Sequence, residues 1–272
     1  MKKGIQMQIA CYSLILGEGY SIPATIEILS RLGYAGVEWR VRDDFHLPVT
    51  DIEGKAEEVK AMCDDAGLAI PALSTYLPIG QTEEVGKVLR AAAKMGATII
   101  RLMVPRYDGS RHYSSLLDEA RRGLAKLEGI CREAGVKAGV ELHMGNITPS
   151  ACAGHRLVKD FSPDWVGILF DPGNMVCEGM ENWKMAIQML GPYLSHVHVK
   201  NGGWYHSEKH GWQFAWAPMN DGIVKWEEVI SFLAENDYQG WLSLEDFADL
   251  PIEQRLEEDL ALMRRWVEKA GE

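Results

Sequence analysis

The feature that most constrains the fold is a rhythm of short apolar runs that recurs eight times along the chain. Each run is bounded by glycine, proline or polar residues, as strands are, and amphipathic helical patterns lie between the runs. Eight such units within 272 residues predict an α/β protein, a (β/α)8 TIM barrel that forms one domain over residues 1–272. The expected strands cover 7–12, 35–41, 69–75, 98–104, 137–143, 166–171, 194–200 and 240–245.

The helix ends favour this barrel over an open, doubly wound sheet. The helix expected over 113–134 buries one leucine-rich face, and the last helix is expected to begin at Pro251. The doubly wound alternative usually carries a three-glycine turn after its first strand, whereas this chain has only Gly17 and Gly19 there. Glycine, a common helix stop, follows four helical patterns, at Gly33, Gly67, Gly96 and Gly135.

The composition excludes several classes of partner. The chain carries 39 acidic and 28 basic side chains, a formal net charge of −11 that repels phosphate backbones, so we expect no nucleic-acid partner. No apolar stretch has the length of a membrane span and the first six residues do not begin a signal peptide, which predicts a cytoplasmic protein without membrane association. The five cysteines are scattered without a CxxC pair, which agrees with a reducing compartment.

One long aromatic segment interrupts the rhythm. Between Lys200 and Lys225 the chain holds five aromatic residues and two histidines, and we expect this segment to form a loop. Loops after the strands of such a barrel lie at its active-site end, so we predict a lid in which Trp204 and Trp216 stack on the apolar face of a sugar. The alternative is that these rings pack on one another as a small satellite core.

Four polar residues end four successive strands. Glu141, Asp171 and His198 follow one another at about one strand–helix unit each, and the aromatic segment accounts for the longer gap to Glu245. Because side chains alternate along a strand, the apolar neighbours of these residues face the helices while the four polar residues face the barrel axis. The four are therefore expected side by side at the carboxyl end of the barrel.

Three carboxylates in one pocket repel each other unless a cation lies between them. Three carboxylate oxygens and one imidazole nitrogen suit a divalent ion with a preference for oxygen, so we predict one ion, Mn²⁺ first, with Mg²⁺, Co²⁺, Fe²⁺ or Zn²⁺ as alternatives. The predicted metal ligands are Glu141, Asp171, His198 and Glu245. The alternative is that each is a separately satisfied polar group at a strand end.

With these residues identified, the chain resembles the sugar isomerase and epimerase superfamily of xylose isomerase-like TIM barrels. The matching segments run in the family's order over most of the chain: GVEWR at 36–40, GVELHMGN at 139–146, FDPGNM at 170–175, HVHVKN at 196–201, GIVKW at 222–226 and SLEDF at 243–247. The resemblance implies a metal-dependent carbohydrate enzyme but does not identify the sugar. Members include ketose 3-epimerases, hydroxypyruvate isomerase, inosose dehydratase, dehydroshikimate dehydratase and enzymes of 3-keto sugars.

The resemblance also implies roles for individual residues. The family's metal ligands fall on the same four positions, and its two proton-transferring glutamates correspond to Glu141 and Glu245. His143 matches a histidine that contacts substrate in related dehydratases and isomerases. Two positions depart from the ketose epimerases: Asn174 replaces a histidine, and Ile147 replaces a glutamate. Both departures weaken the specific expectation of a free-ketose 3-epimerase, and we expect Asn174 to contact substrate.

Other polar residues on inward strand faces are further candidates. Lys200 is expected to act as a catalytic acid or base, or to neutralise an anionic substrate, and its alternative is a salt bridge at the barrel rim. Glu38 and Arg101 are expected to bind substrate hydroxyl or carboxylate groups, with ion pairing as the alternative for each. His196, deeper in the barrel, is expected to contact substrate or to pack in the core.

The predicted function is that of a divalent-metal-dependent sugar isomerase or epimerase. Such an enzyme removes a proton next to a carbonyl and passes through a metal-stabilised enediolate. The first alternative is a lyase or dehydratase acting on an inosose or a 3-keto sugar or glycoside, because the same site serves elimination. The second is a non-catalytic carbohydrate-binding barrel or one subunit of a heteromeric enzyme. The expected partner is a small carbohydrate, and apolar residues on the outer helices are compatible with a homo-oligomer.

Overall fold

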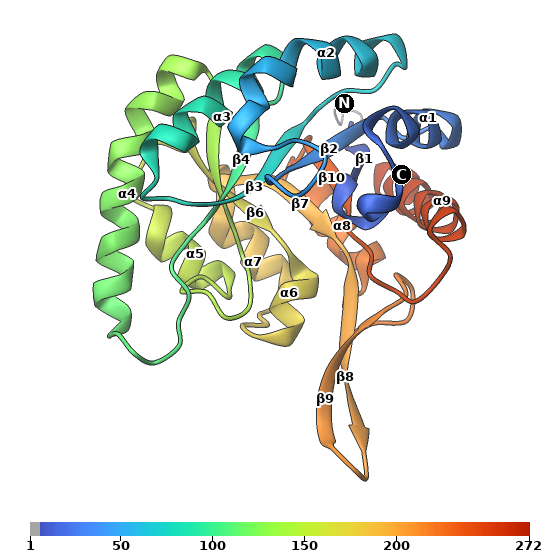
Figure 1. Ribbon diagram of the computed structural model, residues 1–272. Helices are drawn as coiled ribbons and strands as arrows, with labels where there is room; N and C mark the ends of the chain where they lie inside the picture. Colours follow the sequence, from blue (N-terminus) through green and yellow to red (C-terminus); the bar gives the residue numbers. More distant parts are fainter. Residues whose placement is uncertain (1–5) are drawn as a thin grey trace.

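A closed barrel of parallel strands forms the centre of the computed structural model, which describes residues 6–272 apart from the side chain of Glu18 (Figure 1). The strands follow the order β1-β10-β7-β6-β5-β4-β3-β2 around the barrel, which confirms the predicted fold class. Residues 1–5, on which the expectation of no signal peptide depends, lie outside the described residues. The barrel strands are β1 (Gln8–Tyr12), β2 (Gly36–Val41), β3 (Ala72–Pro78), β4 (Ile99–Met103), β5 (Lys137–Glu141), β6 (Val166–Phe170), β7 (Leu194–Val199) and β10 (Trp241–Leu244).

Helices surround the barrel and cover its outer surface (Figure 1). The helix predicted over 113–134 is observed with those bounds, and the last helix follows directly after Pro251. Gly33, Gly96 and Gly135 end their helices in the left-handed conformation, which costs glycine little. The α-helices are α1 (Ile22–Leu32), α2 (Ile52–Asp65), α3 (Thr82–Met95), α4 (Tyr113–Ala134), α5 (Ala151–Val158), α6 (Pro172–Cys177), α7 (Trp183–Leu190), α8 (Trp226–Glu235) and α9 (Ile252–Gly271).

The alternation of side chains along the strands divides the molecule into two apolar regions. Along β2, Val37, Trp39 and Val41 are fully buried in the large cluster between the strands and the helices. A separate small cluster fills part of the barrel interior and consists of Ala72, Ile99 and Leu169. The polar side chains on the inward faces therefore lie above this plug, at the carboxyl ends of the strands.

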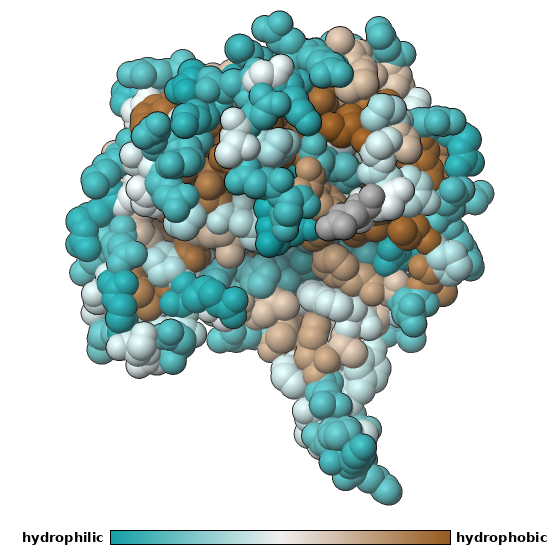
Figure 2. Space-filling model, in the orientation of Figure 1, coloured by the Kyte–Doolittle hydropathy of each residue, from teal (hydrophilic) through white to brown (hydrophobic). Residues whose placement is uncertain are grey.

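The aromatic segment after β7 is a β-hairpin rather than the expected loop. Strands β8 (Asn201–Ser207) and β9 (Gly211–Ala217) pair antiparallel over their whole length, and the hairpin projects away from the barrel (Figure 1). Its far end is hydrophilic, whereas less polar residues gather where it joins the body (Figure 2). In β9, Trp212, Phe214 and Trp216 recur at every second residue, which is the period of a strand, but the segment was interpreted as a loop because it interrupts the strand–helix rhythm.

Within residues 6–272, no helix has both the length and the apolar character that a membrane span requires.

Candidate active site

Four side chains converge at the carboxyl end of the barrel. Glu141 ends β5, Asp171 follows β6, His198 lies on β7 and Glu245 follows β10, so neighbouring strands supply the whole group. All four are at most 3% exposed. Each offers one ligand atom, and these atoms lie within 4.8 Å of one another. The structure thus brings together the four residues that the sequence predicted as metal ligands.

The imidazole of His198 is the centre of this group. Its Nδ1 lies 2.9 Å from Glu141 Oε1, 3.4 Å from Glu245 Oε2 and 3.7 Å from Asp171 Oδ2. The ring of Tyr12 stacks on the imidazole, with the centroids 5.6 Å apart and the planes at 18°. The histidine therefore presents one nitrogen to three carboxylates, in an orientation that the stacked ring supports.

Lys200 brings a positive charge into the same pocket. Its Nζ lies 2.8 Å from Asp171 Oδ2 and also contacts Glu245 Oε2, and the side chain is almost fully buried. A Cβ atom on Gly173 would lie only 2.5 Å from Lys200 Cγ and 2.9 Å from its carbonyl oxygen. Glycine at this position therefore lets the start of α6 approach the lysine closely.

The charges of the pocket balance each other, and this balance shifts the pKa of several groups. Although burial opposes the shift, the surrounding carboxylates hold the pKa of His198 well above its usual value. Burial would lower the pKa of Lys200, but the neighbouring carboxylates raise it. Burial alone would raise the pKa of Glu141 and Glu245, but Arg101, His198 and Lys200 keep the pKa of Glu141 lowered, and Lys200 and His198 keep that of Glu245 lowered. Glu141 and Glu245 are thus ionised, and Lys200 is an ammonium, near neutral pH.

The donor set fits a divalent cation. Three carboxylates and an imidazole present one atom each around a common point, and oxygen-rich sets of this kind suit Mn²⁺ or Mg²⁺. Glu141 Oε2 is buried and accepts no hydrogen bond from a described residue, although Arg101 Nε lies 3.2 Å away. One carboxylate oxygen of the set is therefore only partly satisfied by the protein.

Of three further predicted substrate contacts, Arg101 and Asn174 each lie against one of the four ligands, and His143 follows Glu141 by two residues in the chain. Arg101 on β4 is buried against Glu141, and its guanidinium carbon lies 4.7 Å from the centroid of the Tyr76 ring. His143 is partly exposed, and its Nδ1 lies 2.7 Å from the carbonyl oxygen of Met144. Asn174 donates to Asp171 Oδ2 at 2.8 Å, while its buried Oδ1 has no hydrogen-bond partner among the described residues.

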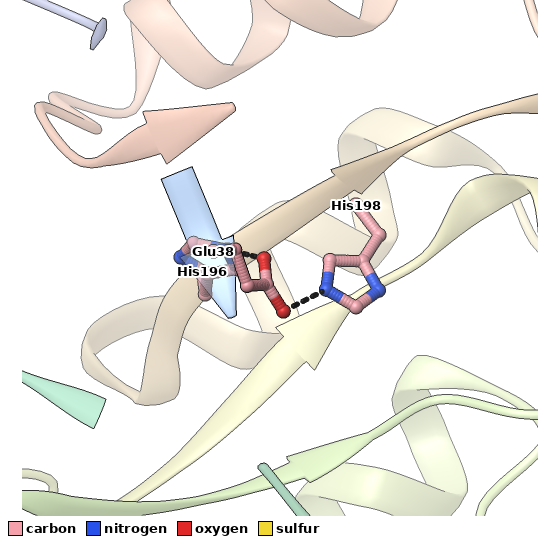
Figure 3. A group of neighbouring side chains, drawn as sticks. All are labelled: Glu38, His196 and His198. Carbon is pink, nitrogen blue, oxygen red and sulfur yellow. Dashed lines mark hydrogen bonds and ion pairs between the residues drawn. The ribbon is translucent and has the colours of Figure 1, made fainter. Parts of the chain in front are cut away.

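Two other predicted contacts lie deeper, below the four ligands. Glu38 on β2 and His196 on β7 are at most 1% exposed, and His196 Nε2 lies 2.8 Å from Glu38 Oε2 (Figure 3). Although burial opposes it, the positive field of His198 and His196 holds the pKa of Glu38 well below its usual value. Both side chains are buried away from the surface from which a substrate would enter.

The two tryptophans predicted to stack on sugar occupy different places on the hairpin. Trp216, near its base, is partly buried, and the Lys200 Nζ lies 5.2 Å from the centroid of its ring. Trp204 is 43% exposed, packs edge-on against Phe214 and donates its indole N–H to the Val176 carbonyl at 2.9 Å. Of the two, only Trp216 is in contact with a residue of the pocket.

Sequence reasoning missed Tyr12 and Ser74. Tyr12 is fully buried on His198, and its hydroxyl has no hydrogen-bond partner among the described residues. Ser74 donates its hydroxyl hydrogen to Glu38 Oε1. Strand parity could have identified Tyr12, because it shares a face with Ala10 and ends β1, but nothing in the sequence marks Ser74.

Comparison with known proteins identifies relatives of this arrangement. The model of the xylose isomerase-like TIM barrel family matches residues 26–266. Inosose dehydratase 1 of Bacillus cereus is 28% identical over 162 residues, which cover 55% of this chain and 53% of that protein. The chain thus spans about half the length of the curated relatives it matches.

Solved structures share the fold over nearly the whole chain. A xylose isomerase-like TIM barrel protein from Mycobacterium smegmatis, in complex with magnesium, has a TM-score of 0.77 at 19% identity and covers 98% of both chains. D-psicose 3-epimerase from Clostridium cellulolyticum H10, with D-tagatose, has a TM-score of 0.76 at 16% identity and covers 96% of this chain and 99% of its own. At these identities the likeness establishes the fold.

Proposed function

Because this chain belongs to the xylose isomerase-like TIM barrel family, we propose that it is a divalent-metal-dependent enzyme acting on a carbohydrate. The reaction begins with removal of a proton from the carbon next to a carbonyl group. Its proposed outcome is isomerisation or epimerisation of the sugar. The observation that carries this proposal is the convergence of Glu141, Asp171, His198 and Glu245 at the carboxyl end of the barrel.

The same four residues would hold the metal ion. When bound, a divalent cation polarises a carbonyl oxygen and offsets the negative charge that develops on it. Asp171 is pre-oriented for this role, because Asn174 donates both its backbone N–H, at 2.9 Å, and its side-chain amide to the two carboxylate oxygens. Arg101 similarly holds Glu141, whose Oε2 lies 3.2 Å from its Nε.

The carboxylates and Lys200 supply the proton transfers. Glu141 and Glu245 remain ionised at neutral pH, so either can accept a proton from carbon. The raised pKa of Lys200 makes it a proton donor rather than a base, and its Nζ is within reach of Glu245 Oε2. We assign Lys200 the role of returning a proton to the product. His143, Arg101 and Trp216 are the proposed substrate contacts nearest these groups.

A lyase is the second candidate, and two positions favour it. By the resemblance described above, Asn174 and Ile147 stand where ketose epimerases carry a histidine and a glutamate, and neither an amide nor an alkyl side chain can act as an acid or base. The curated relatives named above are inosose dehydratases. In this reading Lys200 protonates a departing hydroxyl group, so that water or an alcohol leaves from an inosose or a 3-keto sugar.

Deuterium incorporation separates the two candidates. Metal-loaded protein is incubated in D₂O with separate ketoses, inososes and 3-keto glycosides, and the recovered compounds are analysed by NMR and mass spectrometry. An isomerase or epimerase introduces deuterium at the carbon next to the carbonyl and leaves the molecular formula otherwise unchanged. A lyase produces a conjugated enone with absorbance in the near ultraviolet.

The Lys200→Met variant tests the assigned roles within the same experiment. Removal of the proton donor should slow product formation more than exchange into recovered substrate, because exchange requires only the carboxylate base. The Lys126→Met variant, at an exposed position on α4, is the control. A metal-loaded wild-type protein that exchanges no substrate proton and turns over no member of the panel would contradict the proposal and favour a carbohydrate-binding barrel.

A further inference from the structure

Below the four proposed ligands, a second polar group links three strands through a single carboxylate. Glu38 lies between His196 and His198, whose Nε2 atoms are 2.8 Å and 3.0 Å from its two oxygens (Figure 3). The hydroxyl of Ser74 on β3 donates to the same oxygen that faces His198. All four side chains are at most 1% exposed, and Glu38 and His198 are completely buried.

This group has the residue types of a metal site, but its hydrogen bonds favour another role. His198 belongs both to this group and to the one formed with Glu141, Asp171 and Glu245. A ring that bound a cation at each nitrogen would have to lose both of its ring protons, whereas metal ligation by one nitrogen leaves the other N–H free to donate. Glu38 is correctly placed to accept that hydrogen.

We propose that Glu38 is a positioning residue that orients His198 for the metal ion. A carboxylate only accepts hydrogen bonds, so the His198 nitrogen that faces Glu38, Nε2, carries the hydrogen. The lone pair of a neutral ring is then on Nδ1, the nitrogen that faces Glu141, Glu245 and Asp171. The inference rests on the proposed metal centre and replaces the expectation that Glu38 contacts the substrate.

The geometry excludes substrate contact by Glu38 on two grounds. Both of its carboxylate oxygens already accept hydrogen bonds from protein groups, namely Ser74 and the two histidines. The side chain is also fully enclosed, with Trp39 and Val37 on either side of it in the strand directed into the outer core. Glu38 therefore acts on His198, where it holds the ring in one orientation and determines which ring nitrogen carries the hydrogen.

Titration of metal-free protein with Mn²⁺ tests the proposal. Glu38→Gln keeps the shape of the side chain but removes its charge and leaves only one acceptor oxygen for two imidazoles. We expect this variant to bind Mn²⁺ at least roughly tenfold more weakly than the wild-type protein, as found for partners of metal-bound histidines. Glu58→Gln makes the same chemical change at an exposed position on α2 and should bind Mn²⁺ like the wild-type protein.

A spectroscopic measurement separates orientation of the ring from general support of the fold. In wild-type protein with ¹⁵N-labelled histidine and bound Mg²⁺, the His198 ring should carry its hydrogen on Nε2 alone. In Glu38→Gln at the same Mg²⁺ concentration, which is chosen to be subsaturating, fewer His198 rings are held by the metal, so the resonances should also report metal-free rings that exchange between tautomers. Circular dichroism establishes whether each variant is folded.

Two results would overturn the inference. One is Mn²⁺ affinity within twofold of wild type in a folded Glu38→Gln variant, and the other is a set of His198 resonances at subsaturating Mg²⁺ that does not differ from wild type. If Glu38→Gln does not fold, Ser74→Ala tests the inference instead. This substitution removes one hydrogen bond to Glu38 and does not change the charge of any residue. Weaker Mn²⁺ binding by folded Ser74→Ala supports the inference, and unchanged binding contradicts it. Wild-type protein that binds no Mn²⁺ would instead contradict the proposed metal centre itself.

Discussion

The Lys200 ammonium lies 2.8 Å from the Asp171 carboxylate, inside the same group of residues that would hold a metal ion. Its charge offsets part of the repulsion among three buried carboxylates. The lysine also remains close to any cation that binds there, so it opposes metal binding electrostatically while it supplies a proton to the reaction.

Lys200→Met should make the protein depend on metal for its stability. Without the ammonium, the metal-free pocket holds uncompensated buried charge, a change that typically costs about 3–5 kcal/mol. Bound Mn²⁺ restores the balance, so the rise in Tm on addition of Mn²⁺ should be larger in the variant than in the wild type. Thermal unfolding with and without Mn²⁺ measures this difference, and Lys126→Met is the exposed control. Equal Mn²⁺-induced shifts in the two proteins would contradict it.

Gly173→Ala should damage the pocket although it adds only one methyl group. The new Cβ would lie 2.5 Å from Lys200 Cγ, so either the lysine or the start of α6 must move. Overpacking of this kind costs about 1–3 kcal/mol, and it would also displace Asp171, which caps α6. We expect lower stability, weaker Mn²⁺ binding and lower kcat.

The matched change Gly129→Ala provides the control for Gly173→Ala. Gly129 lies within α4, and a Cβ built on it meets no atom within 4 Å. This substitution should raise helix stability by roughly 0.5–1 kcal/mol and leave Mn²⁺ binding unchanged. Urea unfolding and Mn²⁺ titration of the two variants would reveal whether the damage is specific, and similar behaviour of both would count against the close approach at Gly173.

Trp216→Ala should raise KM for the sugar substrate. The Trp216 ring lies 5.2 Å from the Lys200 ammonium and 5.3 Å from the Phe247 ring, where it can form an apolar wall for the substrate. Loss of a stacking ring should raise KM by about tenfold. Trp212→Ala, at an indole that is 67% exposed near the far end of the hairpin, should leave KM unchanged. Steady-state kinetics with both variants tests this, and an equal effect of the two would refute it.

Stability should fall as the pH rises towards 8, because of a carboxyl pair behind β10. Burial and the negative charge of Asp246 raise the pKa of Asp259 from 3.8 to about 8. A raised carboxyl pKa means that the folded protein binds more protons than the unfolded chain between these values. The contribution of Asp259 to the free energy of unfolding is complete below about pH 4 and is lost as the pH rises through about 8.

Asp259→Asn tests this pH dependence directly. An amide stays neutral, so the variant should lose stability less steeply than the wild type between pH 5 and pH 8. The expected difference in slope is roughly 1 kcal/mol per pH unit. Urea unfolding at several pH values measures it, with the exposed Asp249→Asn as control. Parallel stability curves for wild type and Asp259→Asn would contradict the prediction.

The barrel and its four convergent residues could be predicted because they depend on local patterns. Four successive strand ends are marked by an acidic or imidazole side chain in or after an apolar run, and alternation along the strand determines which way that side chain faces. Parallel strands of a barrel then bring Glu141, Asp171 and His198 together whatever the details of the helices. The order of neighbouring strands around the barrel is therefore enough to predict that these residues converge.

The network around Glu38 could not be predicted from such patterns. Glu38 and His196 meet across the barrel interior, from strands that are not neighbours in the sheet, so their contact depends on how the barrel closes and on the stagger of its strands. The sequence alone could not distinguish a deep acceptor for two histidines from a substrate contact. The hairpin escaped prediction for a different reason, because its strands project beyond the barrel and do not follow the strand–helix rhythm.

The most direct test of the central claim is the metal content of the purified protein and of its Glu245→Gln variant, measured by mass spectrometry after incubation with excess Mn²⁺ and removal of free metal. Glu245 contributes one of the four convergent oxygen and nitrogen atoms, and the variant keeps its size while it loses its charge. We predict close to one divalent ion per wild-type chain and clearly less in the variant. No bound metal in the wild type, or equal metal in both proteins, would contradict it.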